Sequence, residues 1–284
     1  MSGRTARLAP WLGLAPFFGY LLVFLVVPTV TVIAGAFVEG GRPSLVNVRA
    51  LADGSDLHLL WSSVVLSATS AVIGAVLGGF LAYLVVTRPA GSVFRRVVTA
   101  VSGVLAQFGG VPLAFAFIAT LNLNGVVTLA LRDAFGLDVY GSGWLYGVRG
   151  LILVYTYFQI PLMVIVFLPA LEGIRPQWRE AAVNLGASTP QYWRRVAGPM
   201  LLPGFFGSML LLFANAFAAY ATAAVLVSQG APILPLAIRG ALTSEVVLGQ
   251  QNRAYALALE MVVVVALVMV GYVLLVRRTS RWLR

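Results

Sequence analysis

Apolar runs long enough to cross a membrane recur along the chain, with polar residues gathered between them. Six such runs are visible, at about 11 to 37, 60 to 87, 98 to 121, 150 to 171, 201 to 227 and 255 to 276. A spanning helix needs about 20 apolar residues because it must satisfy its own backbone hydrogen bonds across about 30 Å of hydrocarbon. The pattern therefore predicts an all-α polytopic membrane protein with six transmembrane helices. The first run exceeds a signal-peptide core and lacks a clear cleavage site, so we expect it to be retained.

Glycine and proline modify two of these runs. The third contains Gly109, Gly110 and Pro112, which predict a bend or break where protein or water satisfies the freed backbone groups, with a cavity nearby. In the second run, small residues at helical spacing predict close helix packing at Gly74, Gly78 and Gly79.

Arginine placement predicts the orientation in the membrane. The 19 basic residues are all arginine and give a net charge of +10. Thirteen of them fall on one side of the six runs, namely Arg4, Arg7, Arg88, Arg95, Arg96, Arg175, Arg179, Arg194, Arg195, Arg277, Arg278, Arg281 and Arg284. This excess marks the cytoplasmic side and places both termini there, so the charge needs no nucleic-acid partner. Three outer loops follow, at about 38 to 59, 122 to 149 and 228 to 254, in which "VVTLAL" and "PILPLAI" suggest half-helices.

Composition restricts the chemistry that this chain can perform. The sequence is 60% hydrophobic and contains no cysteine, no lysine and one histidine, His58. Thiolate metal sites, histidine clusters and the lysine of a phosphate-binding P-loop are therefore all excluded. An intramembrane enzyme would need a nucleophile with its base, or a metal, and neither is available. We expect no enzymatic activity and no cofactor or metal bound by this chain.

A polar segment, "REAAVNLGASTPQYWRRVAGP", interrupts the apolar pattern between the fourth and fifth runs. It predicts a helix that begins at Pro176 and ends at Gly186, and a second helix capped by Thr189 with Pro190 as its first residue. One apolar stripe runs along the first helix, at Trp178, Ala181, Ala182 and Leu185. Because alanines allow another backbone to approach closely, the stripe favours a protein partner, although an amphipathic loop packed on its own bundle is the alternative.

The spacing of this segment resembles the EAA signature of permease subunits in binding-protein-dependent ABC importers. In that family the pattern runs EAA, three residues, Gly, nine residues, an aliphatic residue, one residue, Leu-Pro. The matching residues here are Glu180, Ala181, Ala182, Gly186, Val196 and Pro199. Gly198 replaces the usual leucine, which suggests a looser turn into the fifth run. The stretches "LGGFLAYLVVTRP", "FGGVPLAFAF" and "YFQIPLMVIVFLPAL" resemble the polyamine, iron and thiamine branch, so that the resemblance covers nearly the whole chain.

The resemblance implies a type I importer architecture with one permease domain, residues 1–284, in the bacterial cytoplasmic membrane. Its loop at about 173 to 199, here called the EAA loop, would dock on a separate pair of ATPase subunits that bind ATP and Mg²⁺. A second permease subunit and an extracytoplasmic binding protein would complete the assembly. Glu180 would pair with a charge or a helix terminus, Ala181 and Ala182 would permit close docking, and Gly186 would make the turn. For Arg194 and Arg195, topology or lipid phosphate contacts suffice.

Polar residues within the runs are candidates for the transport path. Glu260 is the conspicuous one, because a charge facing lipid is costly, while an ion pair or hydration at the interface is its alternative. Weaker candidates are Gln107, Gln159, Asn215 and Tyr220, for which interhelical hydrogen bonds are an equal explanation. The expected cargo is a small polar solute, first a polyamine, then iron, thiamine or a phosphonate. An ion-coupled secondary transporter using Glu260 is the rival function, against which stand the EAA loop and the lack of a visible inverted repeat.

Overall fold

The computed structural model describes residues 14–89, 91–141, 143–227, 233–243 and 250–280. Its elements in chain order are η1 Leu22–Val26, α2 Val27–Ala36, β1 Val38–Glu39, β2 Arg42–Pro43, α3 Val46–Ala50, α4 Gly54–Val86, α5 Val93–Gln107, α6 Gly110–Leu121, α7 Val126–Phe135, η2 Trp144–Tyr146, α8 Val148–Glu172, α9 Pro176–Asn184, α10 Thr189–Tyr192, η3 Trp193–Ala197, α11 Gly198–Ala218, α12 Ala221–Leu226, α13 Leu234–Thr243 and α14 Gln250–Ser280. The described chain is nearly all helical, as predicted. Outside the described residues lie Arg4, Arg7, Arg281 and Arg284, so their part in the orientation stays a prediction.

Six helical segments in the described residues are long and apolar enough to span a membrane. They are Leu14–Ala36, Gly54–Val86, Gly110–Phe135, Val148–Glu172, Thr189–Ala218 and Gln251–Leu274. The predicted number of spans is confirmed, and four of the six lie close to their predicted positions, whereas the third and the fifth differ. By internal contacts the chain forms two units, one of residues 1–57 with 237–262 and one of residues 58–236 with 263–284. Each unit is described by itself.

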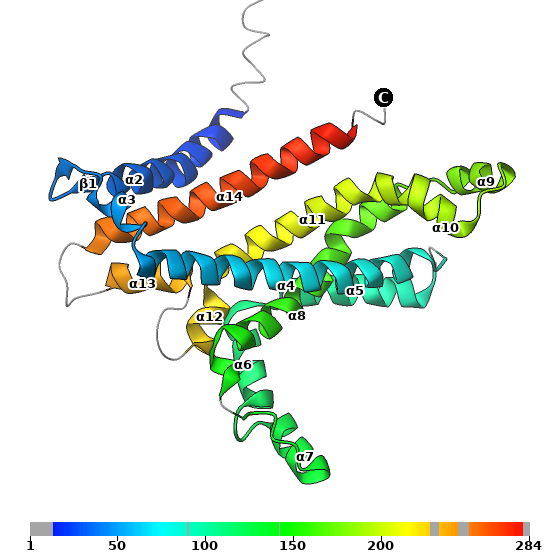
Figure 1. Ribbon diagram of the computed structural model, residues 1–284, viewed down its shortest axis with the longest axis horizontal. Helices are drawn as coiled ribbons and strands as arrows, with labels where there is room; N and C mark the ends of the chain where they lie inside the picture. Colours follow the sequence, from blue (N-terminus) through cyan, green and yellow to red (C-terminus); the bar gives the residue numbers. More distant parts are fainter. Residues whose placement is uncertain (1–13, 90, 142, 228–232, 244–249, 281–284) are drawn as a thin grey trace, which may run out of the picture. The chain divides into compact units, whose positions relative to one another are not determined.

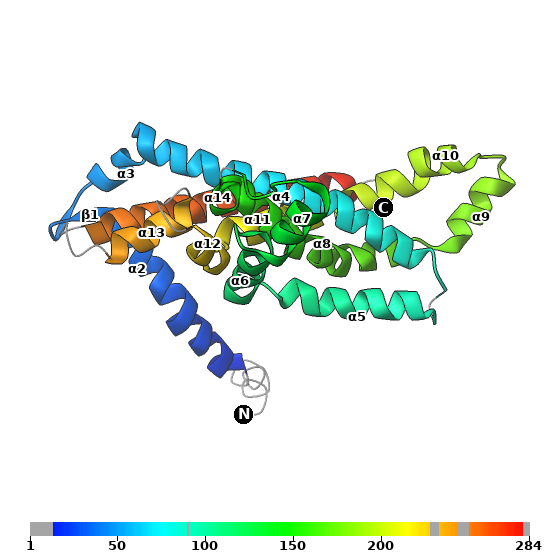
Figure 2. The same cartoon turned by 90° about the horizontal axis from the view of Figure 1, so that it is seen from below.

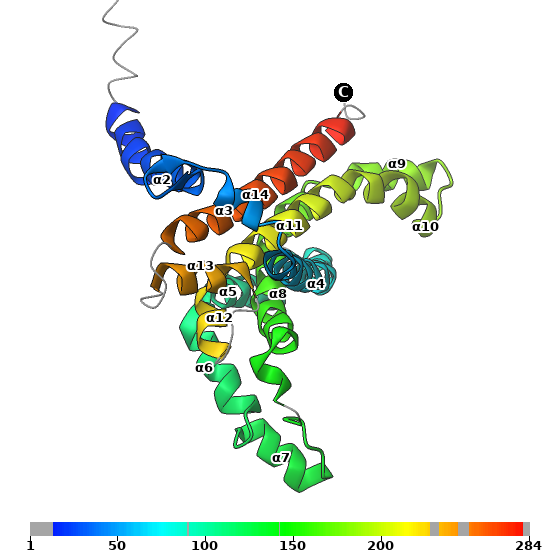
Figure 3. The same cartoon turned by 60° about the vertical axis from the view of Figure 1, so that its left-hand side comes forward.

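Helix α8 is the centre of the second unit. Figure 2 shows it between α4 and α5, and it packs along both α5 and α11. Two buried clusters surround it, one around Tyr155 and Phe158 and the other around Met163 and Phe167. In Figures 1 and 3, α9 and α10 project at one end of this unit, whereas α7 lies at the end of a separate arm formed with α6. The unit therefore holds the EAA loop away from its core.

The glycines of α4 allow this close packing. A Cβ at Gly74 would lie 2.5 Å from Cβ of Gln159, and one at Gly78 would collide with the carbonyl oxygen of Ile160 and with Met163. At Gly79 it would lie 3.2 Å from the Phe205 ring. The predicted packing role is confirmed for Gly74 and Gly78, where residues of α8 occupy the space that a side chain would need; at Gly79 the nearest neighbour is instead the ring of Phe205 in α11.

The third span differs from its prediction in extent. Residues 98–121 are two helices, α5 and α6, separated by Phe108 and Gly109. Gly109 is extended, and Gly110 has a φ of +69°, which residues other than glycine rarely adopt. The predicted break is confirmed, but the apolar segment of membrane length begins at Gly110 and continues to Phe135. The prediction was wrong here because α5 is amphipathic and begins at Val93, so its apolar residues mark one face rather than a span.

Short helices occur where the outer loops were expected. "VVTLAL" forms the first part of α7, and α13 begins at Leu234 and contains the last five residues of "PILPLAI". The fifth span ends at Ala218 and a separate short helix, α12, follows after Ala219 and Tyr220, so the predicted end at 227 was too late. Helix formation in the two loops is confirmed, and their position at the membrane edge stays a prediction.

The first unit contains the only strands among the described residues. Strands β1 and β2 form a hairpin in which Glu39 pairs with Arg42, and the turn uses Gly40 and Gly41 at φ values of +57° and +79°. Positive φ at both central residues is the conformation of the tight hairpin turn that matches strand twist. Gly35 of α2 lies against the ring of Tyr255 in α14, where a Cβ would collide with it.

Candidate functional site

The first helix of the EAA loop has the predicted limits. Helix α9 begins at Pro176, whose missing N–H costs nothing at a helix start, and ends before Gly186, which has a φ of +77°. The N–H of Gly186 donates to the carbonyl of Val183 at 2.9 Å, and that of Ala187 donates to the carbonyl of Ala182 at 2.9 Å. These two bonds form a Schellman motif, which satisfies carbonyls that the end of the helix would leave unpaired.

The second helix begins one residue earlier than predicted. Ser188, not Thr189, is the N-cap of α10, and the side chain of Gln191 accepts a hydrogen bond from the Ser188 N–H at 2.8 Å. Serine followed three residues later by glutamine forms a reciprocal capping box. Thr189 cannot form one, because the residue three positions after it is Tyr192.

No turn separates the second loop helix from the fifth span. Residues Thr189–Ala218 are helical throughout, with a π-helical turn at Trp193–Ala197. A Cβ on Gly198 would lie 2.5 Å from the carbonyl oxygen of Trp193, so the π turn requires glycine there. The suggestion of a looser turn at Gly198 was therefore wrong, since the backbone is helical and crowded at that position.

The EAA loop has a small core of its own. Ala182, Tyr192 and Ala197 are buried together, with Ile174 and Trp193 packed at the edge. Ala182 is only 8% exposed, so it faces this core, whereas Ala181 is exposed. The two alanines that the sequence treats alike thus have different surroundings, and only Ala181 is freely open to a partner.

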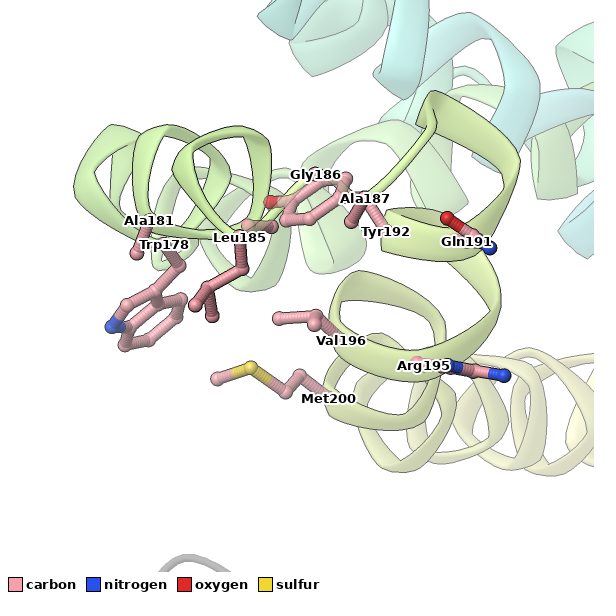
Figure 4. A pocket seen from close by; sticks show the side chains of 11 residues that line it. Trp178, Ala181, Leu185, Gly186, Ala187, Gln191, Tyr192, Arg195, Val196 and Met200 are labelled. Atoms are coloured by element: carbon pink, nitrogen blue, oxygen red, sulfur yellow. The ribbon is translucent and has the colours of Figure 1, made fainter.

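A groove of about 780 Å³ lies between α9 and the helix that leads into α11, and we call it the loop groove. Its lining comprises Trp178, Ala181, Ala182, Leu185, Gly186, Ala187, Gln191, Tyr192, Arg195, Val196 and Met200. Figure 4 shows Trp178, Ala181 and Leu185 on one wall and Val196 and Met200 facing them, with Arg195 at the far rim. All four residues of the predicted apolar stripe line this groove, as does Val196 of the signature, but Pro199 and Glu180 do not.

The charged residues of α9 have no partner within the described chain. Glu180 is exposed, and no ion pair or hydrogen bond joins it or Arg179 to another described residue. Glu180 is the fifth residue of α9, and the first turn of the helix has no acidic residue. The helix-terminus role expected for Glu180 is therefore wrong, and a charge on a partner remains the other expectation.

The polar candidates for the transport path in the second unit have different environments. Gln159 is fully buried on α8, where its Nε2 donates to the carbonyl of Leu212 at 3.0 Å. This is the interhelical hydrogen bond that was the alternative explanation for it. Gln107 ends α5 and Asn215 lies on α11, both exposed, while Tyr220 precedes α12 and is half-buried. Of these four residues, only Gln159 is fully buried.

Backbone groups at the two helix breaks are satisfied by side chains that the sequence did not single out for this role. Thr222 donates to the carbonyl of Gly110 at 3.2 Å, and the Tyr155 hydroxyl donates to the carbonyl of Ala219 at 2.7 Å. Helix α12 thus packs on the start of α6 and closes both breaks from within the protein. The sequence gives only a weak signal for these two hydrogen bonds, because each hydroxyl is far along the chain from the carbonyl that it binds.

Glu260 belongs to the first unit, where it lies near a buried carboxylate. Asp56 is 1% exposed, and its Oδ1 accepts a hydrogen bond from Nη2 of Arg253 at 2.7 Å. The Asp56 and Glu260 carboxyl groups are close enough to interact electrostatically. Oδ2 of Asp56 and Oε2 of Glu260 are both buried without a hydrogen-bond partner among the described residues. We call Asp56, Arg253 and Glu260 the carboxylate cluster; sequence analysis found only Glu260, because Asp56 resembled an ordinary residue of an outer loop.

No group of three metal-ligating side chains occurs within the described part of the chain. Two carboxylates and one guanidinium leave the carboxylate cluster with one uncompensated negative charge when both acids are ionised. The chemistry of this cluster is therefore the binding of a single positive charge, and that of the loop groove is the binding of apolar side chains.

Comparison with curated proteins finds transporter subunits. A probable ABC transporter permease protein of Sinorhizobium fredii is 27% identical over 228 residues, covering 79% of this chain and 39% of the relative. A ferric transport system permease protein of Actinobacillus pleuropneumoniae is 26% identical over 210 residues, covering 72% of this chain and 30% of the relative. A sulfate transport system permease protein of Escherichia coli is 28% identical over 214 residues, covering 71% and 65%. The chain spans about two fifths or less of the length of the first two relatives.

Solved structures share the fold over almost the full chain. A bacterial ABC transporter that imports the polysaccharide alginate matches with a TM-score of 0.73 at 16% identity, covering 98% of this chain and 96% of the other. The same kind of transporter in complex with an alginate-bound periplasmic protein matches with a TM-score of 0.74 at 18% identity, covering 96% of each chain. These structures support the expected type I permease architecture.

Membership of the family rests on a match to a family model. The family model describes the inner membrane component of binding-protein-dependent transport systems and matches residues 74–283. The matched residues contain the EAA loop and five of the six spanning segments in whole or in part. The chain therefore belongs to the family of inner membrane components of binding-protein-dependent transport systems, the permease subunits of ABC importers.

Proposed function

We propose that this chain is the transmembrane subunit of an ATP-driven importer and that its loop groove receives an ATPase subunit. The observation that carries the proposal is an apolar groove left open in an otherwise polar loop. Leu185 is 87% exposed on its wall, and Trp178 and Ala181 lie beside it. Exposed apolar side chains grouped in a groove with a polar rim are typical of a protein contact.

The loop is built to transmit a displacement. Ala182, Tyr192 and Ala197 pack α9 against the second wall of the groove, so the two walls move together. That second wall is the start of the helix Thr189–Ala218, which crosses the expected membrane region without a turn. A partner that shifts α9 would therefore also shift α11, because packed helices move as rigid elements.

The energy must come from another chain. An ATP-driven importer must bind ATP with Mg²⁺, and this sequence has no lysine with which to form a P-loop. We infer that both are bound by a separate pair of ATPase subunits, a basic group of which would pair with Glu180. The chain itself would be no enzyme and would bind no cofactor.

The remaining partners follow from the family. We infer a second permease subunit, an extracytoplasmic binding protein and residence in the bacterial cytoplasmic membrane with both termini on the cytoplasmic side. The alginate transporter that shares this fold was solved with a periplasmic protein, which supports the proposal of an extracytoplasmic binding protein. The excess of arginines on the side of the EAA loop supports the orientation.

For the cargo we propose a small polar solute. The sequence resemblance favours a polyamine, whereas the relatives are named for ferric iron and for sulfate. Uptake of labelled spermidine, ferric ion and sulfate by cells with and without this gene would discriminate among them. Loss of spermidine uptake alone supports the polyamine, and loss of either of the others replaces it.

The docking site can be tested by co-purification of the affinity-tagged chain from its host, with mass spectrometry to detect a P-loop ATPase. Leu185→Glu should abolish recovery of the ATPase, because it places a charge in the apolar groove. Val183→Glu is the matched control, since Val183 is 60% exposed on the same helix but does not line the groove. Recovery of the ATPase with Leu185→Glu, or its equal loss with Val183→Glu, would refute docking in the groove.

A second candidate function has one observation in its favour. The carboxylate cluster buries two oxygens without partners, as a site that carries a proton or cation would, so ion-coupled transport by Glu260 remains the rival. Uptake that persists when the ATPase gene is deleted but stops with an uncoupler and with Glu260→Gln would establish it. Uptake that requires the ATPase and is unchanged in Glu260→Gln would exclude it.

A further inference from the structure

Two adjoining grooves lie near the loop groove, and one of them shares Tyr192 with it. One, of about 390 Å³, is lined by Tyr83, Val86, Thr87, Leu171, Ile174, Arg175, Pro176, Arg179, Thr189, Tyr192 and Trp193. The other, of about 410 Å³, is lined by Gly79, Tyr83, Phe167, Leu171, Trp193, Leu201 and Phe205. They share Tyr83, Leu171 and Trp193, so they form one continuous surface. We call the first the polar groove and the second the apolar slot.

The polar groove carries uncompensated positive charge. Arg175 and Arg179 both line it, both are exposed, and neither guanidinium group has an ion pair or hydrogen bond to another described residue. By contrast, Arg95 of α5 is paired with Glu172, the last residue of α8. No acidic residue lines either groove in the described structure. Two free guanidinium groups in one groove match the geometry and charge of a phosphate.

The apolar slot begins where the polar groove ends. Its seven lining residues are all apolar, aromatic or glycine, and they come from α4, α8, η3 and α11. Gly79 forms its floor opposite Phe205, where a Cβ would lie 3.2 Å from the ring and would narrow the slot. An apolar slot of this kind, between helices of membrane-spanning length, fits an acyl chain.

The shared residues include two of the types that are common at a membrane surface. Tyr83 and Trp193 pack edge to face with ring centroids 5.4 Å apart, at the junction of the two grooves. Tyrosine and tryptophan are enriched at the membrane interface, where their rings lie among headgroups. A molecule with its charged group in the polar groove and its apolar part in the apolar slot would therefore have the orientation of a lipid in a bilayer.

We propose that the polar groove and the apolar slot together bind one anionic phospholipid, with its phosphate at Arg175 and Arg179 and an acyl chain along Gly79. Basic pockets between membrane helices on the cytoplasmic side recognise lipid headgroups through this combination of charges. The site is distinct from the loop groove and does not depend on the cargo. Because Arg175 and Pro176 begin α9, a lipid bound here would brace the start of the helix that we expect to dock on the ATPase.

The test is native mass spectrometry of the purified full-length chain in detergent, titrated separately with phosphatidylglycerol and phosphatidylcholine. We expect one phosphatidylglycerol to bind with a preference on the order of tenfold or more over phosphatidylcholine. Arg175→Gln with Arg179→Gln should abolish the preference. Arg88→Gln with Arg96→Gln removes the same charge from residues outside both grooves and should retain it. These arginines are exposed or at a helix end, so folding should be preserved in both double variants.

Two further measurements separate a lipid from other occupants. Gly79→Leu should weaken phosphatidylglycerol binding by filling the slot, with the helical circular dichroism unchanged, and free glycerol phosphate in tenfold excess should not compete. Equal binding of the two lipids, or equal loss in the Arg88 and Arg96 control, would overturn the proposal. Competition by glycerol phosphate would indicate a phosphate site instead, and displacement of the lipid by the partner permease would indicate a protein interface.

Discussion

The loop groove and the carboxylate cluster are assembled over very different distances along the chain. Every residue that lines the groove lies between Trp178 and Met200, and its support also comes from the same segment. The bond between Asp56 and Arg253 joins residues 197 positions apart. The groove is thus a local structure held by caps and a small core, whereas the cluster exists only when two distant helices meet.

This difference predicts how far the destabilisation caused by a substitution should extend. Loss of a local support should open the EAA loop while the spanning helices stay packed, because local segments unfold at lower free energy than the core. Loss of a distant buried pair should weaken the unit that contains it, because the remaining charge has no water and no partner.

Arg253→Ala should have the largest effect on stability. It leaves Asp56 charged and buried, and we expect the free energy of unfolding to fall by about 3 kcal/mol, at the low end for a buried pair because the Arg253 side chain is 42% exposed. Denaturant unfolding in detergent, followed by circular dichroism, would measure it. Arg42→Ala, on the exposed hairpin, is the control; an equal loss there would mean that Asp56 is not the cause.

Ala182→Glu should be next, and its effect should stay local. The glutamate would enter the core of Ala182, Tyr192 and Ala197 and destabilise the EAA loop by about 2 kcal/mol. Limited proteolysis should then cut between residues 175 and 190 while far-UV circular dichroism changes little. Ala181→Glu, one position away on the exposed face, should remain resistant; cleavage of both variants alike would show that the two alanines are equivalent after all.

Gly186→Val isolates the backbone conformation of the turn. Nothing lies within 4 Å of a Cβ built at Gly186, so the cost comes from its φ of +77° alone, about 1.5 kcal/mol. We expect ATPase recovery and transport to fall while membrane insertion persists. Gly186→Asn should be milder, because asparagine tolerates this conformation, and equal transport by valine and asparagine variants would contradict the role of the turn.

Ser188→Ala should have the smallest measurable effect and discriminates between two caps. Loss of the capping box should destabilise the start of α10 by about 1 kcal/mol, seen as faster amide hydrogen exchange at Gln191 and Tyr192. Thr189→Ala removes the hydroxyl that the sequence analysis had assigned to the cap and should leave exchange unchanged. The reverse result would restore Thr189 as the cap.

Local patterns predicted much of the fold and of the loop. The six spans follow from run length, and the turn at Gly186 follows from a glycine placed after an amphipathic stripe. Where prediction failed, two local signals competed. Thr189 and Ser188 are both acceptable caps, and only Gln191 three residues after Ser188 decides between them. In α5 the apolar face of an amphipathic helix resembles part of a spanning run. In the structure the break at Gly109 and Gly110 separates α5 from α6.

By itself, the sequence determined a membrane protein with six apolar spans and a helical loop of the EAA type, because length and spacing act within a few helical turns. Only the tertiary structure decided that Ala182 faces inward while Ala181 faces outward, that Gln159 bonds to α11 and that Asp56 is the buried partner of Arg253. It also joined Arg175 and Arg179 to a slot between α4, α8, η3 and α11. The physical reason is that burial and pairing depend on neighbours from distant parts of the chain, which a local pattern does not specify.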